Sequence, residues 1–62
     1  MTTEEKFLEY LRTHKRPVLA ATLAKRFIVS QSHASSILNA LYENGLAEVR
    51  LEGRKKFYKA KD

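Results

Sequence analysis

Apolar residues recur at helical spacing from the start of the chain. Phe7 and Leu11 lie four residues apart, which places both on one face of a helix. Thr2 and Glu5 have the Ser/Thr-x-x-Glu spacing of a capping box, which marks a helix start. This pattern predicts a helix over residues 3 to 14.

A connector and a short second helix are expected next. Pro17 disfavours helical backbone in the residue before it, so residues 16 to 18 are predicted to form a connector or one short strand. Apolar side chains then repeat every three to four positions, which predicts a helix over residues 20 to 27. These side chains belong to Ala20, Ala21, Leu23, Ala24 and Phe27.

A third helix is predicted between Ser30 and Gly45. The β-branched residues Ile28 and Val29 weaken the preceding helix, and Ser30 is a preferred N-cap. The apolar stripe that follows ends before Gly45, which is expected to be the left-handed residue of a Schellman motif. This stripe consists of Ala34, Ile37, Leu38 and Leu41.

The apolar period changes from helical to alternating after the third helix. Residues 47 to 51 alternate between apolar and charged, and a second extended segment covers residues 57 to 60. Together they predict a β-hairpin with the two-residue turn Glu52–Gly53, which gathers basic residues at its tip. The predicted cross-strand pairs are Ala47 with Tyr58, Val49 with Lys56 and Leu51 with Arg54.

The order of these elements defines the expected fold. It is α+β and mainly α, a winged helix-turn-helix in which three helices are followed by a β-hairpin wing. Residues 1 to 62 are expected to form a single domain, because a chain this short has room for one small core.

Two segments also resemble known transcription regulators. Residues 29 to 37, V-S-Q-S-H-A-S-S-I, resemble the start of the recognition helix in LysR-type and MarR-type regulators. Residues 44 to 46, the run R-L-E-G-R at 50 to 54 and the aromatic pair at 57 and 58 are similar to the wing of ArsR-type repressors. The resemblance implies a small winged helix-turn-helix regulator. Metal sensing is not implied, since the ArsR-type cysteines and terminal dimerisation helices have no counterpart here.

The positive charge of the chain is concentrated near its end. There are 12 basic and 7 acidic residues, for a net charge of +5. Between residues 50 and 61, six Lys and Arg side chains stand against Glu52 alone. Such a concentration indicates a polyanionic partner, most simply nucleic acid. The absence of cysteine excludes a disulfide framework, a thiolate zinc site and a cysteine nucleophile.

The face of the third helix opposite its apolar stripe is polar and almost free of charge. Small donors and acceptors suit a helix in the major groove of DNA, where bulk and negative charge would hinder approach to bases and phosphates. A merely solvated Ser-rich face is the alternative. The predicted recognition residues are Ser30, Gln31, Ser32, His33, Ser35, Ser36 and Asn39.

Basic side chains of the hairpin are predicted to bind phosphates or to enter the minor groove. The alternative is that they protect an exposed strand edge from aggregation. A further basic pair, Lys25 and Arg26, either complements the dipole at the end of the second helix or contacts the DNA backbone. The predicted wing residues are Arg50, Arg54, Lys55 and Lys56.

These features predict a sequence-specific regulator of transcription, a repressor or an activator, that binds double-stranded DNA. One alternative is a winged-helix protein–protein interaction module that docks on a larger transcription or replication complex. Another is a non-specific nucleoid-type binder, for which a more uniform basic coat is expected. No paired carboxylates, Gly-rich phosphate loop or metal-ligand spacing indicates an enzyme, a cofactor or a metal site. No membrane span or signal segment is predicted, so we expect a cytoplasmic protein that is nucleoid-associated when bound to DNA.

Binding as a pair is expected from the size of the domain. A single DNA-binding module buries about 600 to 1,000 Å² on DNA, which is modest for selecting one site in a genome. We therefore expect a homodimer, or two copies that pair on DNA. Lys6, Tyr10 and Thr13 on the first helix form the candidate dimer face, with closure of the small core as the alternative role of Tyr10.

Overall fold

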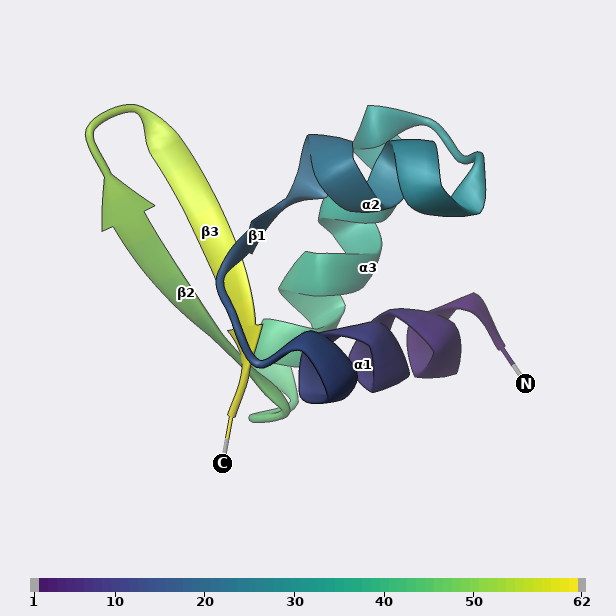
Figure 1. Cartoon of the computed structure of the whole chain (residues 1–62), viewed down its shortest axis with the longest axis horizontal. Coiled ribbons are helices and arrows are strands. Elements are labelled where there is room, and N and C mark those ends of the chain that lie inside the picture. Colours follow the sequence, from purple (N-terminus) through teal and green to yellow (C-terminus); the bar gives the residue numbers. More distant parts are fainter. Residues whose placement is uncertain (1, 62) are drawn as a thin grey trace.

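The computed structural model describes residues 2 to 61, which form a helical layer packed on one face of an antiparallel sheet (Figure 1). Its fold is α+β and mainly helical, with the layout of a winged helix, as the sequence predicts. None of the helices in the described part is long and apolar enough to cross a membrane. The elements in order are α1 (Thr3–His14), β1 (Val18–Leu19), α2 (Ala20–Phe27), α3 (Gln31–Glu43), β2 (Ala47–Glu52) and β3 (Lys55–Ala60).

Side-chain caps fix the starts of α1 and α3. The Glu5 backbone N–H donates to Thr2 Oγ1 over 3.2 Å, and the Thr2 backbone N–H donates to Glu5 Oε1 over 3.4 Å. At α3, the His33 backbone N–H donates to Ser30 Oγ over 3.1 Å. Both predicted caps are therefore confirmed, and the two helices begin where the sequence places them.

The end of α3 is a Schellman motif, as predicted. Gly45 has a φ of +74°, which places it in the left-handed region. The Leu46 N–H donates to the carbonyl oxygen of Leu41 over 2.9 Å, and the Gly45 N–H donates to that of Tyr42 over 3.1 Å. These bonds satisfy the last carbonyls of α3 and turn the chain into β2.

The connector after α1 supplies a third strand. The sheet order is β1-β3-β2, and Val18 pairs with Tyr58 while Leu19 pairs with Phe57. A short strand was one of the two predicted outcomes for this segment, and the structure places it at Val18–Leu19. Because β1 leads directly into α2, it ties the wing to the helix-turn-helix.

The predicted register of the hairpin is wrong, although its faces are right. The turn is Gly53–Arg54, and Ala47 pairs with Ala60 instead of Tyr58. Gly53 has a φ of +62° and Arg54 does not have a positive φ, a pattern typical of a type II′ turn with glycine first. The pairing shifts by two residues, so Ala47 and Tyr58 still share the inner face.

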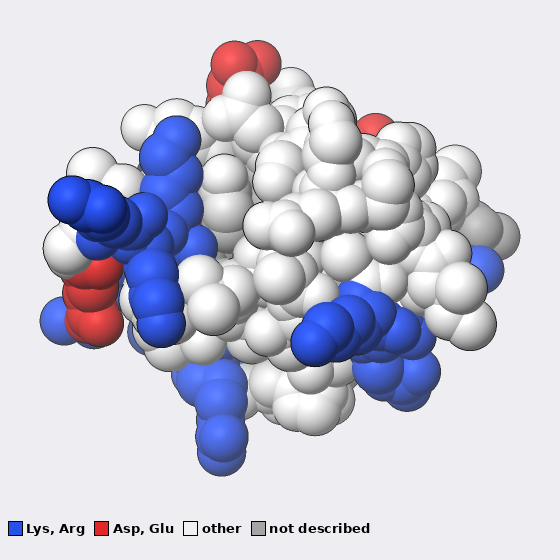
Figure 2. Space-filling model, turned by 90° about the horizontal axis from the view of Figure 1, so that it is seen from above, with Lys and Arg blue, Asp and Glu red and all other residues white. Residues whose placement is uncertain are grey.

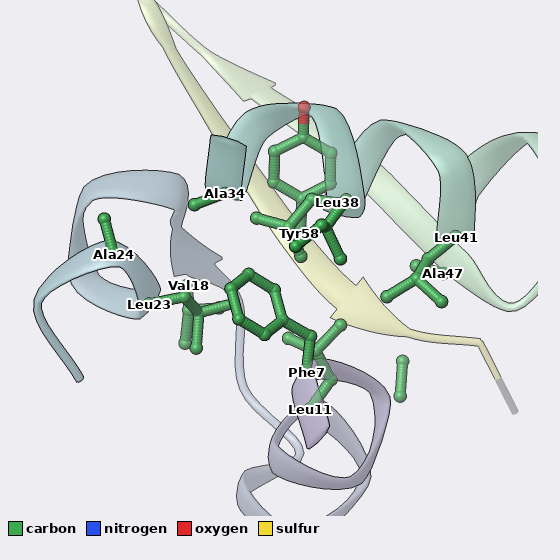
Figure 3. Packing of buried hydrophobic residues seen from close by; sticks show 12 residues of the cluster. Phe7, Leu11, Val18, Leu23, Ala24, Ala34, Leu38, Leu41, Ala47 and Tyr58 are labelled. Carbon is green, nitrogen blue, oxygen red and sulfur yellow. The ribbon is translucent and has the colours of Figure 1, made fainter. Parts of the chain in front are cut away.

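The core lies between the helical layer and the inner face of the sheet (Figure 3). Phe7, Leu11 and Leu38 are fully buried. Phe7 stacks on Phe27 with ring centroids 5.0 Å apart, which joins α1 to α2. The buried cluster consists of Phe7, Leu11, Val18, Leu23, Ala24, Ala34, Ile37, Leu38, Leu41, Ala47, Tyr58 and Ala60.

Candidate nucleic-acid interface

A groove separates the basic hairpin tip from the start of α3. One wall comes from α2 and α3 and includes Gln31 and Ser35, and the other wall comes from β3 and the hairpin turn. Among the described residues, no acidic side chain lines this groove. Its lining residues are Leu19, Ala20, Ala21, Gln31, Ser35, Arg54, Lys55, Lys56 and Tyr58.

The wall formed by α3 carries the predicted polar face. Ser32, Ser36 and Asn39 are exposed, and Ser35 is half-buried beside the groove. The apolar stripe on the other side of α3 is buried, so the helical-wheel assignment of the two faces is confirmed. Glu43 is the only charged residue of α3, and it lies in the last turn. Most of the exposed face can therefore approach a polyanion without charge repulsion.

Two of the predicted recognition residues already have partners within the chain. The hydroxyl of Ser30 accepts the cap hydrogen bond at the start of α3, so its first role is structural. Asn39 Nδ2 donates to Glu43 Oε1 over 3.4 Å. Pairing of Asn39 with a base would replace this exposed, long hydrogen bond.

The opposite wall presents positive charge. Arg54, Lys55 and Lys56 are exposed at or beside the turn, and within residues 2 to 61 none of them forms a salt bridge. Figure 2 shows Lys and Arg side chains on the hairpin side, at the left, and a second basic group at the lower right. Most of the surface between the two groups in this view is uncharged, so basic side chains flank it on both sides.

Arg50 does not join the other wing residues. It lies on the outer face of the sheet, in the register position opposite Phe57, and lines a separate hollow with Pro17 and Tyr42. Its Nε lies 3.5 Å from Glu52 Oε1. The structure thus brings together three of the four predicted wing residues.

The basic pair at the end of α2 is divided between two surfaces. Lys25 shares a hollow with Ser30 and Gln31, close to the start of α3. Arg26 instead lies over the ring of Phe27, 5.6 Å from its centroid, on the side of α1. Lys25 is therefore the member of the pair that lies beside the start of α3.

Tyr58 is a groove residue that is not among the predicted site residues. Its ring is buried, with 5% of the residue exposed, and it lines the groove between the two walls. In Figure 3 its hydroxyl is at the end of the ring that points away from the buried cluster. Tyr58 therefore belongs both to the buried cluster and to the lining of the groove.

The candidate dimer face on α1 is partly used by the chain itself. Lys6, Tyr10 and Thr13 line one hollow, together with Arg26 and Phe27. Tyr10 is half-buried, and its ring packs edge-on against Phe27 with centroids 5.9 Å apart. This position matches the alternative role of Tyr10, closure of the core, and dimerisation through this face stays a prediction.

The chain matches no protein-family model, and comparisons with curated proteins and with solved structures gave no significant match. Within residues 2 to 61, no three His, Cys, Asp or Glu side chains are grouped as a metal site would require. The resemblance to LysR-type, MarR-type and ArsR-type regulators therefore stays a prediction, and the function is inferred from the groove and its two walls.

Proposed function

We propose that this protein is a sequence-specific double-stranded DNA-binding regulator of transcription. In this proposal α3 enters the major groove and the hairpin tip holds phosphates or the minor groove. The observation that carries the proposal is the groove that places the uncharged start of α3 beside Arg54, Lys55 and Lys56.

In this proposal the basic wall supplies affinity for any DNA sequence, and the α3 wall supplies contacts that can distinguish sequences. Lysine and arginine side chains supply sequence-independent affinity, because they displace the counterions condensed on DNA. Gln31, Ser32 and Ser35 offer hydrogen-bond donors and acceptors that can reach base edges or phosphates. The free backbone N–H groups in the first turn of α3 favour a phosphate at the same place.

The proposal is tested by titrating a labelled duplex, chosen by site selection, at several salt concentrations. Replacing Arg54, Lys55 and Lys56 together by Ala should weaken binding to selected and random duplexes alike. The slope of log affinity against log salt should become shallower by up to about 0.9 for each phosphate that the variant no longer neutralises.

A matched triple variant controls for net charge. Arg12, Lys59 and Lys61 line a basic hollow near the ends of α1 and β3, away from the hairpin turn, and their replacement by Ala removes the same charge. We expect this variant to keep most of the salt dependence. Equal loss in both triple variants would mean that net charge, and not the wing, determines binding.

The second candidate function is a protein-interaction module. It is favoured by exposed apolar side chains, of which Ile28 is 91% and Leu51 is 67% exposed. If the folded protein and its triple variants all bind the selected and the random duplexes with the same weak affinity, this function is supported over DNA binding.

A further inference from the structure

β2 forms an open edge of the sheet. In the order β1-β3-β2, it pairs with β3 on one side only (Figure 1). Its other side therefore carries backbone N–H and C=O groups that can pair with a further strand. Leu51, at 67% exposure, and Tyr42, at 50% exposure, are apolar side chains on β2 and on the helix that packs against it.

The sequence of β2 is complementary to itself. When two copies of the segment Ala47–Leu51 run antiparallel with Val49 opposite Val49, Glu48 of each copy faces Arg50 of the other. Ala47 of each copy then faces Leu51 of the other, so the apolar residues meet on the inner face. Both charged pairs lie on the outer face, where Glu48 and Arg50 point.

The register centred on Leu51 also pairs opposite charges, Arg50 with Glu52, but within the strand it joins only residues 50 to 52 of each copy. The registers centred on Arg50 and on Glu48 lack the match. Centring the pair on Arg50 places Arg50 against its own copy and Glu48 against Glu52 of the other copy. Centring it on Glu48 places two glutamates together. Centring it between two residues would put the inner face of one copy beside the outer face of the other, which separates the apolar residues. Like charges directly opposite one another are destabilising, whereas opposite charges stabilise a strand pair.

We propose that two copies of this chain associate through their β2 edges, centred on Val49, to form one continuous six-stranded antiparallel sheet. Leu51 of each copy is then covered by Ala47 of the other, and Tyr42, which lines a hollow with Val49, lies at the margin of the contact. The contact area is small, so the dimer is weak and depends on concentration. This inference does not rest on DNA binding.

The experiment uses charge reversal on the full chain in the absence of DNA. Analytical ultracentrifugation over a concentration series should show a reversible dimer for the unchanged protein. Glu48→Arg should weaken dimerisation by about tenfold or more, because arginines then face arginines, and Arg50→Glu should do the same with glutamates.

Two combinations restore the charge match. The double variant Glu48→Arg with Arg50→Glu again pairs opposite charges and should dimerise like the unchanged chain. An equimolar mixture of the two single variants should form a heterodimer, because every facing pair is then Glu with Arg. Both positions are exposed, so each variant is expected to keep the fold. Amide NMR spectra of each variant check this.

Lys6→Glu reverses an exposed charge on the α1 face and is the matched control. It should leave the β2 dimer unchanged. A monomer at every concentration, or a dimer that Lys6→Glu disrupts while both single β2 variants leave it intact, would overturn the proposal. A folded double variant or mixture that fails to associate would overturn it as well.

Discussion

Ile28 holds an unfavourable backbone conformation in the turn between α2 and α3. Its φ is +55°, in the left-handed region, where a β-branched residue is rarely found. The residue is 91% exposed, so the side chain gains little from burial there. The backbone N–H groups of Ile28 and Val29 both donate to the carbonyl oxygen of Ala24, so this conformation closes the end of α2.

Replacing Ile28 by Gly should therefore stabilise the protein. Glycine adopts a positive φ without steric cost, and the strain of about 1 to 2 kcal/mol exceeds the additional chain entropy that glycine loses on folding. We expect a net gain of about 1 kcal/mol in the free energy of unfolding, measured by urea denaturation. Ile28→Ala removes the side chain but keeps a Cβ at positive φ, so it should gain much less. Equal effects of the two substitutions would contradict this account.

Ser36 tests whether the exposed face of α3 meets DNA. It lies on the exposed face among other uncharged residues, so Ser36→Glu would bring a negative charge against phosphates. Binding to the selected duplex should be abolished, as measured by fluorescence anisotropy, while the thermal unfolding midpoint changes little. Ser36→Gln adds similar bulk without charge and should retain more affinity. Full affinity in a folded Ser36→Glu protein would favour the interaction-module function.

At the scale of single elements, the caps were predictable and the hairpin register was not. Capping residues act within three or four positions, so Thr2, Ser30 and Gly45 could be assigned from local sequence. The register depends on pairs across the hairpin. A Glu52–Gly53 turn would have placed Arg50 opposite Lys55, whereas the observed register pairs Glu52 with Lys55.

The candidate site shows the same contrast between features that depend on neighbouring residues and features that depend on distant ones. The polar face of α3 follows from helical periodicity, which is local. The outer-face position of Arg50 follows from the alternation along β2, which is also local. The separation of Lys25 from Arg26 depends on how α1 packs beside α2, which no local pattern contains. Tyr58 lines the groove from β3, beside Leu19 of β1 and Ala20 of α2, which are far from it in the sequence.

Gly45 is expected to determine where α3 ends. Its φ is +74° and no heavy atom lies within 4 Å of the position that a Cβ would occupy, so any cost of Gly45→Ala comes from the backbone conformation alone. The free energy of unfolding should fall by about 1 kcal/mol. Gly45→Asn should cost less, because Asn tolerates the left-handed region better. Thermal or urea unfolding of both variants measures the difference, and equal losses would show that backbone conformation is not the cause.

At the scale of the whole molecule, DNA binding by two copies is expected, since one small domain covers a single half-site. We predict two chains per selected duplex at saturation, on half-sites about 34 Å apart. Sedimentation of the complex measures this stoichiometry. One chain per duplex with nanomolar affinity would refute it, whichever surface joins the two copies.

The strand pair β1–β3 has a consequence for how the protein folds. Val18 and Tyr58 are 40 residues apart in sequence, and the chain between them contains α2, α3 and β2. Closing so long a loop costs more entropy than forming a helix or a hairpin, so this pairing is expected late in folding, after the local elements have formed. Until it forms, the hairpin is not tied to α2. The groove, which needs both walls in place, is therefore expected to be completed late in folding.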